Sequence, residues 1–286
     1  MCVIALKYLE KYGWVGGKNR DRAYKPIVHI KKSFRRDTER LFIWDDGTKW
    51  TEGINEYGVG IISAASGSPK EMKKDEKAPK DLEKLQSKDG KRIRTALFEK
   101  TVDSALKQLI EDNVIGNTAI FSGEKCVLLE SAVMAGEYKY ETREFKKDEI
   151  LVRTNHGIVV PGMGYQHGDN RKSSEVRRDM TIEKLEDASS PKDVLDALSQ
   201  VDKKDPQFAP LRKVDKSSSE MQLWTSGQLI VMPKEKSLHY KPLNSKVEFD
   251  LNKLNSEDHK TKFEVISNNN LLELRGVSGF LEFLEL

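Results

Sequence analysis

The chain has 286 residues, of which 37% are hydrophobic, enough to bury the core of one large domain or two small ones. Its 49 basic and 46 acidic residues give a net charge of +3, so charge indicates neither a nucleic-acid nor a membrane partner. No apolar run approaches the roughly 18 residues that span a bilayer, and no secretory signal opens the chain. We therefore expect a soluble, cytoplasmic protein.

The composition also argues against disulfides and metal. The two cysteines, Cys2 and Cys126, are too few for a disulfide framework, which agrees with a reducing compartment. The histidines are scattered, without the paired spacing typical of metal ligands, so we expect no built-in metal site. We find no internal repeat and no clean domain boundary, and we predict one domain over residues 1–286.

The start of the chain predicts a hairpin. Residues 2–6 read as a short buried strand, and residues 14–17 as a second strand that ends in a turn. The reversal at residues 11–13 returns Asn19–Arg22 to the side of Cys2. Once the initiator methionine is removed, Cys2 carries a thiol and a free α-amine. The pKa of an α-amine is about 7.7–8.0 and that of a thiol is about 8.5, so the amine can take the thiol proton. Taken alone, a cysteine at this position is more simply an accident of the first codon.

Short strands continue to residue 65, with runs at 27–31 and 40–44 that are rich in β-branched and aromatic residues and a further run at 59–65. The sequence then changes to lysine, glutamate and aspartate with two prolines, which predicts a charged insertion or loop at about 66–92. A lid over a site remains an alternative for this segment, but a loop on the protein surface is the simpler interpretation.

Apolar residues from Ile93 to Ile110 recur at helical spacing, with a stop signal at Gly116, and predict one long amphipathic helix. Strand character returns in four runs: 118–122, 125–130, 138–141 and 150–153. Cys126 lies within one of these strands, where a free cysteine usually acts as a small buried hydrophobe. We therefore discount it as a nucleophile.

Asn155 follows directly where the strand 150–153 ends. Its amide could donate to a developing oxyanion, although local sequence alone favours an ordinary turn asparagine. His156 is interpreted as a structural hydrogen-bonding residue. Helices are predicted from Ser173 and from Ser190, and the last third returns to strands at 221–226, 228–232, 237–241 and 246–250 before an apolar tail over 271–286.

Five motifs stand in a fixed order along the chain: Met-Cys at the start, Gly-Lys-Asn-Arg-Asp, Glu-Gly-Ile-Asn-Glu-Tyr-Gly-Val, Thr-Asn-His-Gly and Ser-Ser-Glu-Val-Arg-Arg. Together they resemble the cysteine N-terminal-nucleophile (Ntn) hydrolases, within them the choloylglycine hydrolase and penicillin V acylase group with the related C45-type acyltransferase-like proteins. The resemblance runs from residue 1 to roughly 240. It implies an α+β fold in which two antiparallel sheets lie between helical layers, αββα.

The resemblance also implies roles for individual residues. Cys2 corresponds to the nucleophile and its amine to the proton acceptor. Asp21 corresponds to the carboxylate that holds this amine, and Asn155 to the oxyanion donor. Arg177 corresponds to the arginine that completes the charge network, with Arg178 as the alternative register.

Two positions depart from the family pattern. Lys18 stands where an arginine is common, and Arg20 is the candidate to supply that cation instead. The second oxyanion donor is expected to be a backbone N–H near Ala65 or Ser66. Bile-salt hydrolases commonly carry asparagine at this place, so the alanine argues against bile-salt specificity.

The resemblance implies hydrolysis of a small, non-peptide N-acyl amide through a thioester acyl-enzyme, with no cofactor or metal and with only Met1 to remove. An acyltransferase, a dipeptidase-like peptidase and a non-catalytic Ntn-fold protein stay open, as does a homo-oligomer. A nucleic-acid-binding role, suggested by the lysines of the segment from Lys70 to Arg94, has the least support, because acidic residues nearly match the basic ones there. A membrane partner is not expected.

Overall fold

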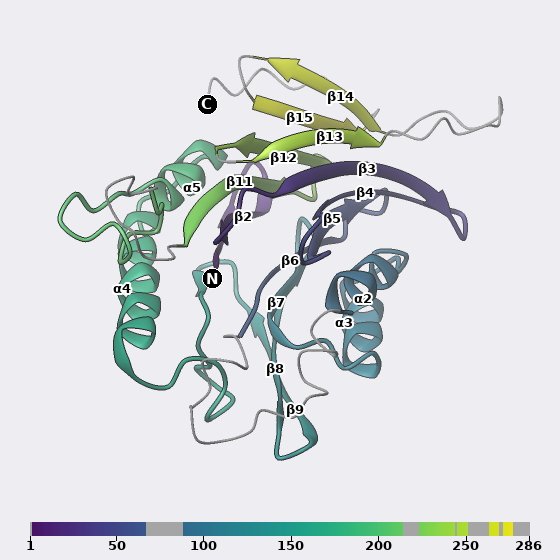
Figure 1. The fold of residues 1–286 in the computed structure, drawn as a ribbon. Coiled ribbons are helices and arrows are strands. Elements are labelled where there is room, and N and C mark those ends of the chain that lie inside the picture. The colour runs from purple at the N-terminus through teal and green to yellow at the C-terminus, as the bar shows by residue number, and fades with distance from the viewer. Residues whose placement is uncertain are drawn as a thin grey trace.

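The computed structural model describes residues 2–66, 88–213, 223–243, 245–250, 263–268 and 271–276, arranged mainly in two sheets (Figure 1). The first sheet has the strand order β10 (Leu151–Arg153), β1 (Cys2–Leu9), β2 (Gly13–Arg22), β11 (Trp224–Met232), β12 (Ser237–Pro242), β15 (Leu271–Gly276) and β14 (Phe263–Asn268). The second has the order β13 (Lys246–Asp250), β3 (Ile27–Arg35), β4 (Thr38–Asp45), β5 (Thr51–Asn55), β6 (Gly60–Ala64), β7 (Gly116–Phe121), β8 (Cys126–Met134) and β9 (Glu137–Phe145).

Two pairs of helices cover the outer faces of the two sheets (Figure 1). α4 (Gly168–Leu185) and α5 (Pro191–Leu198) pack on the first sheet, and α2 (Asp89–Ala96) and α3 (Val102–Glu111) pack on the second. Among the described strands, β13 runs parallel to β3 and the other pairings are antiparallel. The predicted αββα architecture is confirmed.

The alternation of side chains along β1 shows how the layers are held together. Ile4 and Leu6 belong to the apolar core between the two sheets, whereas Val3 and Ala5 pack in the core beneath α4 and α5. Successive strand residues point to opposite faces, so the part of β1 that is buried on both sides, residues 2–6, is apolar throughout. Burial of each large aliphatic side chain contributes about 1.5–3 kcal/mol.

The helix predicted from Ile93 to Ile110 is wrong as a single element, because the chain forms α2 and α3 with a break between them. Thr101 begins α3 through a capping box with Ser104, which satisfies backbone N–H groups that a continuous helix would not leave free. α2 also begins at Asp89, inside the segment predicted as a loop. Residues 67–87 of that segment lie outside the described residues.

Two other element boundaries differ from the prediction. α4 begins at Gly168 rather than at Ser173, after an extended His167. Residues 224–226 and 228–232 of the two predicted runs form one strand, β11, whose register shifts between Thr225 and Gly227, a bulge that lets the strand continue. Residues 221 and 222 lie outside the described residues. The cap at Ser190 with Pro191 at the first helical turn is confirmed. The end of the predicted apolar tail, residues 277–286, is outside the described part.

None of the described helices is long and apolar enough to cross a membrane.

Candidate active site

The first hairpin places Cys2 directly opposite Arg20, as the sequence predicts. Residues 19–22 do not turn, however: β2 continues as a strand to Arg22, and all ten of its residues are buried. The prediction that this strand ends at Gly17 is therefore wrong. The charged residues stay in a strand because each one finds a buried partner, on one or the other face of the sheet.

The face of β2 toward the second sheet carries three cations. Lys18 and Arg20 both donate to Glu52, and Arg20 also donates to Asp45 at 2.7 Å. The Arg22 guanidinium donates to Asp45 at 2.5 Å. Three buried cations thus face two buried carboxylates, which leaves one positive charge in a region of low dielectric where charges interact strongly.

The thiol of Cys2 lies beside this excess positive charge. Its Sγ is 3.9 Å from Nη1 of Arg22, and its side chain is 4% exposed. Burial raises the pKa of the thiol, but neighbouring positive charges, Lys18 and Arg22 among them, outweigh it and hold the pKa below its ordinary value. A thiolate at Cys2 would balance the third cation, which favours the nucleophilic form of the sulfur.

The opposite face of β2, toward α4 and α5, holds the carboxylate of Asp21. Arg177 of α4 donates to Asp21 Oδ2 at 3.0 Å, and the hydroxyl of Thr225 donates to Oδ1 at 2.9 Å. Nη1 of Arg212 lies 3.9 Å from the same carboxylate. Burial and the neighbouring Arg212 lower the pKa of Arg177 to about 10, so it remains a cation at neutral pH.

The register of α4 resolves the choice between the two adjacent arginines. Arg177 is fully buried against Asp21, whereas Arg178 is partly exposed and pairs with Asp179 at 2.7 Å. Arg177 is therefore the arginine that reaches the neighbourhood of Cys2.

Asn155 links the backbone of Cys2 to Arg177 through hydrogen bonds. Its Oδ1 accepts the N–H of Cys2 at 2.9 Å and an Arg177 N–H at 3.3 Å. Its Nδ2 donates to the carbonyl of Ala65 at 2.5 Å. Strands β1 and β10 are antiparallel and pair Ile4 with Arg153. Continuing this register by two residues places Asn155 opposite Cys2. Asn155, an ordinary turn residue by its local sequence, is thus buried and forms hydrogen bonds to Cys2, Arg177 and Ala65.

Four of the five predicted site residues therefore lie in one contact network: Cys2, Asp21, Asn155 and Arg177. The nitrogen of Cys2 donates to Asn155, not to Asp21, which binds Arg177 and Thr225 instead. Arg20 lies opposite Cys2, but its guanidinium is engaged by Glu52 and Asp45.

The two residues that the sequence analysis set aside occupy structural positions. His156 Nδ1 lies 2.8 Å from the Ser174 hydroxyl, and burial together with nearby Arg171 lowers its pKa to about 4. Cys126 is fully buried, and burial raises the pKa of its thiol. Neither is placed as a base or a nucleophile for chemistry at Cys2.

Sequence reasoning missed residues that contact this network or the cations beside it, among them Arg22, Glu52 and Arg212. Glu52 occurs inside a quoted motif and Arg22 directly follows one. Nothing in the local sequence shows that Glu52 pairs with Lys18 and Arg20, or that Arg22 pairs with Asp45, across the two sheets. Arg212 lies in the segment between α5 and β11, in a stretch without any motif, and only the fold brings it to Asp21.

The low thiol pKa leads to a prediction about reactivity. Alkylation of Cys2 by iodoacetamide should reach half its maximal rate at a lower pH than an ordinary thiol, because a lower pKa preserves thiolate as pH falls. In Arg22→Gln the midpoint should move to higher pH. Peptide-resolved mass spectrometry would follow Cys2, with Cys126 as the internal control. An unchanged midpoint in Arg22→Gln would exclude Arg22 as a cause of the shift.

No protein-family model matches the chain, and neither does any curated protein sequence. Among solved structures, the fold is similar to penicillin V acylase from Agrobacterium tumefaciens, with 12% identity, a TM-score of 0.47, and coverage of 84% of this chain and 83% of that one. It is also similar to a mutant conjugated bile acid hydrolase from Clostridium perfringens, with 10% identity, a TM-score of 0.47, and coverage of 85% and 89%.

Proposed function

We propose that this chain is an amidohydrolase that cleaves a small, non-peptide N-acyl amide with Cys2 as its N-terminal nucleophile. The observation that carries the proposal is the hydrogen bond at 2.9 Å from the Cys2 nitrogen to Asn155 Oδ1, beside a thiol whose pKa is held low. The nitrogen and the sulfur of one residue are thereby fixed next to an amide group that can both accept and donate.

In the proposed reaction, the free amine of Cys2 accepts the thiol proton, and the sulfur attacks the carbonyl carbon of the substrate. Asn155 Oδ1 stabilises the resulting ammonium. The second hydrogen of Asn155 Nδ2, with a backbone N–H near Ala65, donates to the oxyanion. The C–N bond then breaks as the ammonium returns its proton to the leaving nitrogen. Water hydrolyses the thioester and regenerates the thiol.

The surrounding charges support each stage of this sequence. Lys18 and Arg22 favour the thiolate before attack. Arg177 donates to Asn155 Oδ1 and so limits how far the side chain can rotate, while Asp21 holds Arg177 in place. Asp21 is therefore proposed to act as a positioning residue, through Arg177 and Asn155.

The test is a substrate screen on protein whose mass shows that Met1 is absent. A panel of N-acyl glycines of increasing acyl length would be assayed for amine release beside a panel of dipeptides, with Cys2→Ser as the control. We expect release from N-acyl amides and a thioester adduct on the Cys2 peptide. Release from dipeptides alone would favour the peptidase, and transfer of the acyl group to an added amine would favour the acyltransferase. No adduct and no release would overturn the proposal.

The oxyanion role of Asn155 gives a separate prediction. Asn155→Asp keeps an oxygen for the Cys2 nitrogen but removes the NH₂ donor, so kcat should fall by about 10²- to 10³-fold with a smaller change in KM. Steady-state kinetics would measure both constants, and thermal unfolding would show whether the variant remains folded. A folded variant with unchanged kcat would contradict this role.

A further inference from the structure

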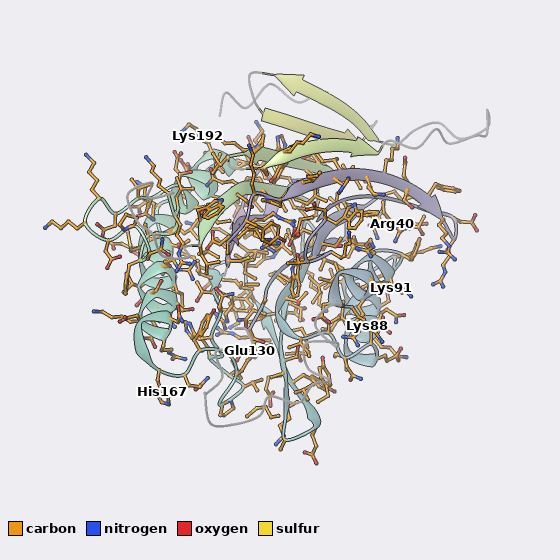
Figure 2. All side chains as sticks on the ribbon, in the orientation of Figure 1. Arg40, Lys88, Lys91, Glu130, His167 and Lys192 are labelled. Atoms are coloured by element: carbon orange, nitrogen blue, oxygen red, sulfur yellow. The ribbon has the colours of Figure 1, made fainter. Side chains whose placement is uncertain are left out.

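A second site lies away from Cys2, on the outer face of the second sheet. Strands β3 and β4 and helix α2 line an open pocket of about 440 Å³, within the size range of small-molecule sites. Its lining residues are Lys31, Arg35, Arg40, Phe42, Trp44, Lys91, Arg94, Thr95 and Phe98. In Figure 2, Arg40 and Lys91 lie on the same side of the molecule, one from the strand and one from the helix.

The charge of this pocket is one-sided. Five of its nine lining residues are lysine or arginine and none is acidic, although the whole chain has nearly equal numbers of basic and acidic residues. Such a concentration of cations around a cavity raises the local positive potential and attracts anions.

Arg40 is the most informative member of the cluster. It is 6% exposed, and its guanidinium donates to the Arg94 carbonyl and to the Ser33 hydroxyl at 2.9 Å, while its Nε has no partner. Within the described residues, no carboxylate forms an ion pair with Arg40. A buried cation without a counter-charge is costly, because burial removes its hydration.

The neighbouring cations add to that cost. Burial, with the charges of Arg94, Arg35 and Arg36, lowers the pKa of Arg40 to about 10. Arg94 is likewise satisfied only by neutral groups among the described residues, donating to the Thr51 hydroxyl at 2.6 Å and to the Lys49 carbonyl at 3.3 Å. An anion in the pocket would relieve this repulsion.

Aromatic rings hold the cations in place. The Arg40 guanidinium lies 3.5 Å from the centroid of the Phe98 ring, and Arg94 lies 5.8 Å from that of Trp44. These cation–π contacts keep the planar donors in fixed positions without neutralising their charge. Guanidinium groups fixed in this way match the oxygens of phosphate, which they can bind in a bidentate manner.

We propose that this pocket binds a small polyphosphate, either free or as part of a nucleotide. The number of cations indicates a ligand with several negative charges, and the volume of about 440 Å³ favours a small molecule over a nucleic-acid strand, whose phosphates would need an extended basic groove. This site is independent of the amidohydrolase proposal, since it lies on a different sheet and involves none of the residues near Cys2.

Isothermal titration of the full chain with inorganic tripolyphosphate, ATP and adenosine would test this site. We expect the two phosphate compounds to bind and adenosine not to bind. Tighter binding of ATP would identify a nucleotide ligand, and equal affinities would identify the phosphate chain alone. Absence of binding by both phosphate compounds would overturn the proposal, as would tighter binding of a single-stranded oligonucleotide.

A matched pair of variants separates the pocket from net charge. Arg35→Gln with Lys91→Gln removes two exposed cations at the pocket rim, whereas Lys184→Gln with Lys192→Gln removes two exposed cations from α4 and α5, and Figure 2 shows Lys192 on the other side of the molecule. The affinity for tripolyphosphate should fall about tenfold in the first double variant and stay within about twofold in the second. Equal losses in both would overturn a defined site.

Discussion

A chain with one glycine inserted between Met1 and Cys2 is expected to lose the proposed amidohydrolase activity by about 10³-fold in kcat/KM, the range typical of a missing general base. In this variant the nitrogen of Cys2 stays in a peptide bond, which is not basic. The N–H can still donate to Asn155 Oδ1, as it does at 2.9 Å in the structure. The hydrogen bond is therefore kept while the base is lost.

The comparison requires a matched protein in which a site-specific protease releases Cys2 as the first residue. Both proteins would be assayed for amine release and for alkylation of Cys2. We expect alkylation to persist in the inserted form, because Lys18 and Arg22 still favour the thiolate. Equal amidase activity in the two forms would mean that a group other than the amine accepts the thiol proton. His156 is a poor substitute, since burial lowers its pKa to about 4.

Most strands could be predicted because their apolar residues form runs that are recognisable in the local sequence. Residues 2–6 and residues 151 and 152 are apolar, so they are buried in a strand whichever face they occupy. The break before α3 also had a local signal, since Thr101 and Ser104 have the spacing of a helix cap, but the apolar periodicity on both sides concealed it.

The site was only partly predictable, because its charges pair over long distances in sequence. Lys18 and Arg22 look like members of a solvated turn until Glu52 and Asp45 reach them from the second sheet. Arg212 meets Asp21 only after α4, α5 and β11 are assembled. Motifs can identify Cys2 and Asn155 as candidates, but local sequence carries no information on which charges will face each other in the core.

Arg177→Gln should lower the free energy of unfolding by about 3–5 kcal/mol, the cost typical of breaking a buried ion pair. Arg177 is fully buried and donates to Asp21 at 3.0 Å and to Asn155 at 3.3 Å. At a fully buried position, water does not replace the hydrogen bonds that are lost with the guanidinium. After the substitution, Asp21 would keep the Thr225 hydroxyl, and among the described residues Arg212, at 3.9 Å, would be its remaining ion-pair partner. Urea denaturation would measure the change.

The adjacent residue provides the matched control. Arg178→Gln makes the same chemical change one position along α4, where the guanidinium is partly exposed and pairs with its sequence neighbour Asp179. That variant should stay within about 0.5 kcal/mol of the original protein. Arg177→Lys keeps the charge but has a single donor nitrogen in place of the two that contact Asp21 and Asn155, so its loss should be intermediate. Similar losses for Arg177→Gln and Arg178→Gln would contradict the assignment of Arg177 to the network. A large loss at Arg177 alone, with slower alkylation of Cys2, would indicate that the same contacts stabilise the fold and position the nucleophile.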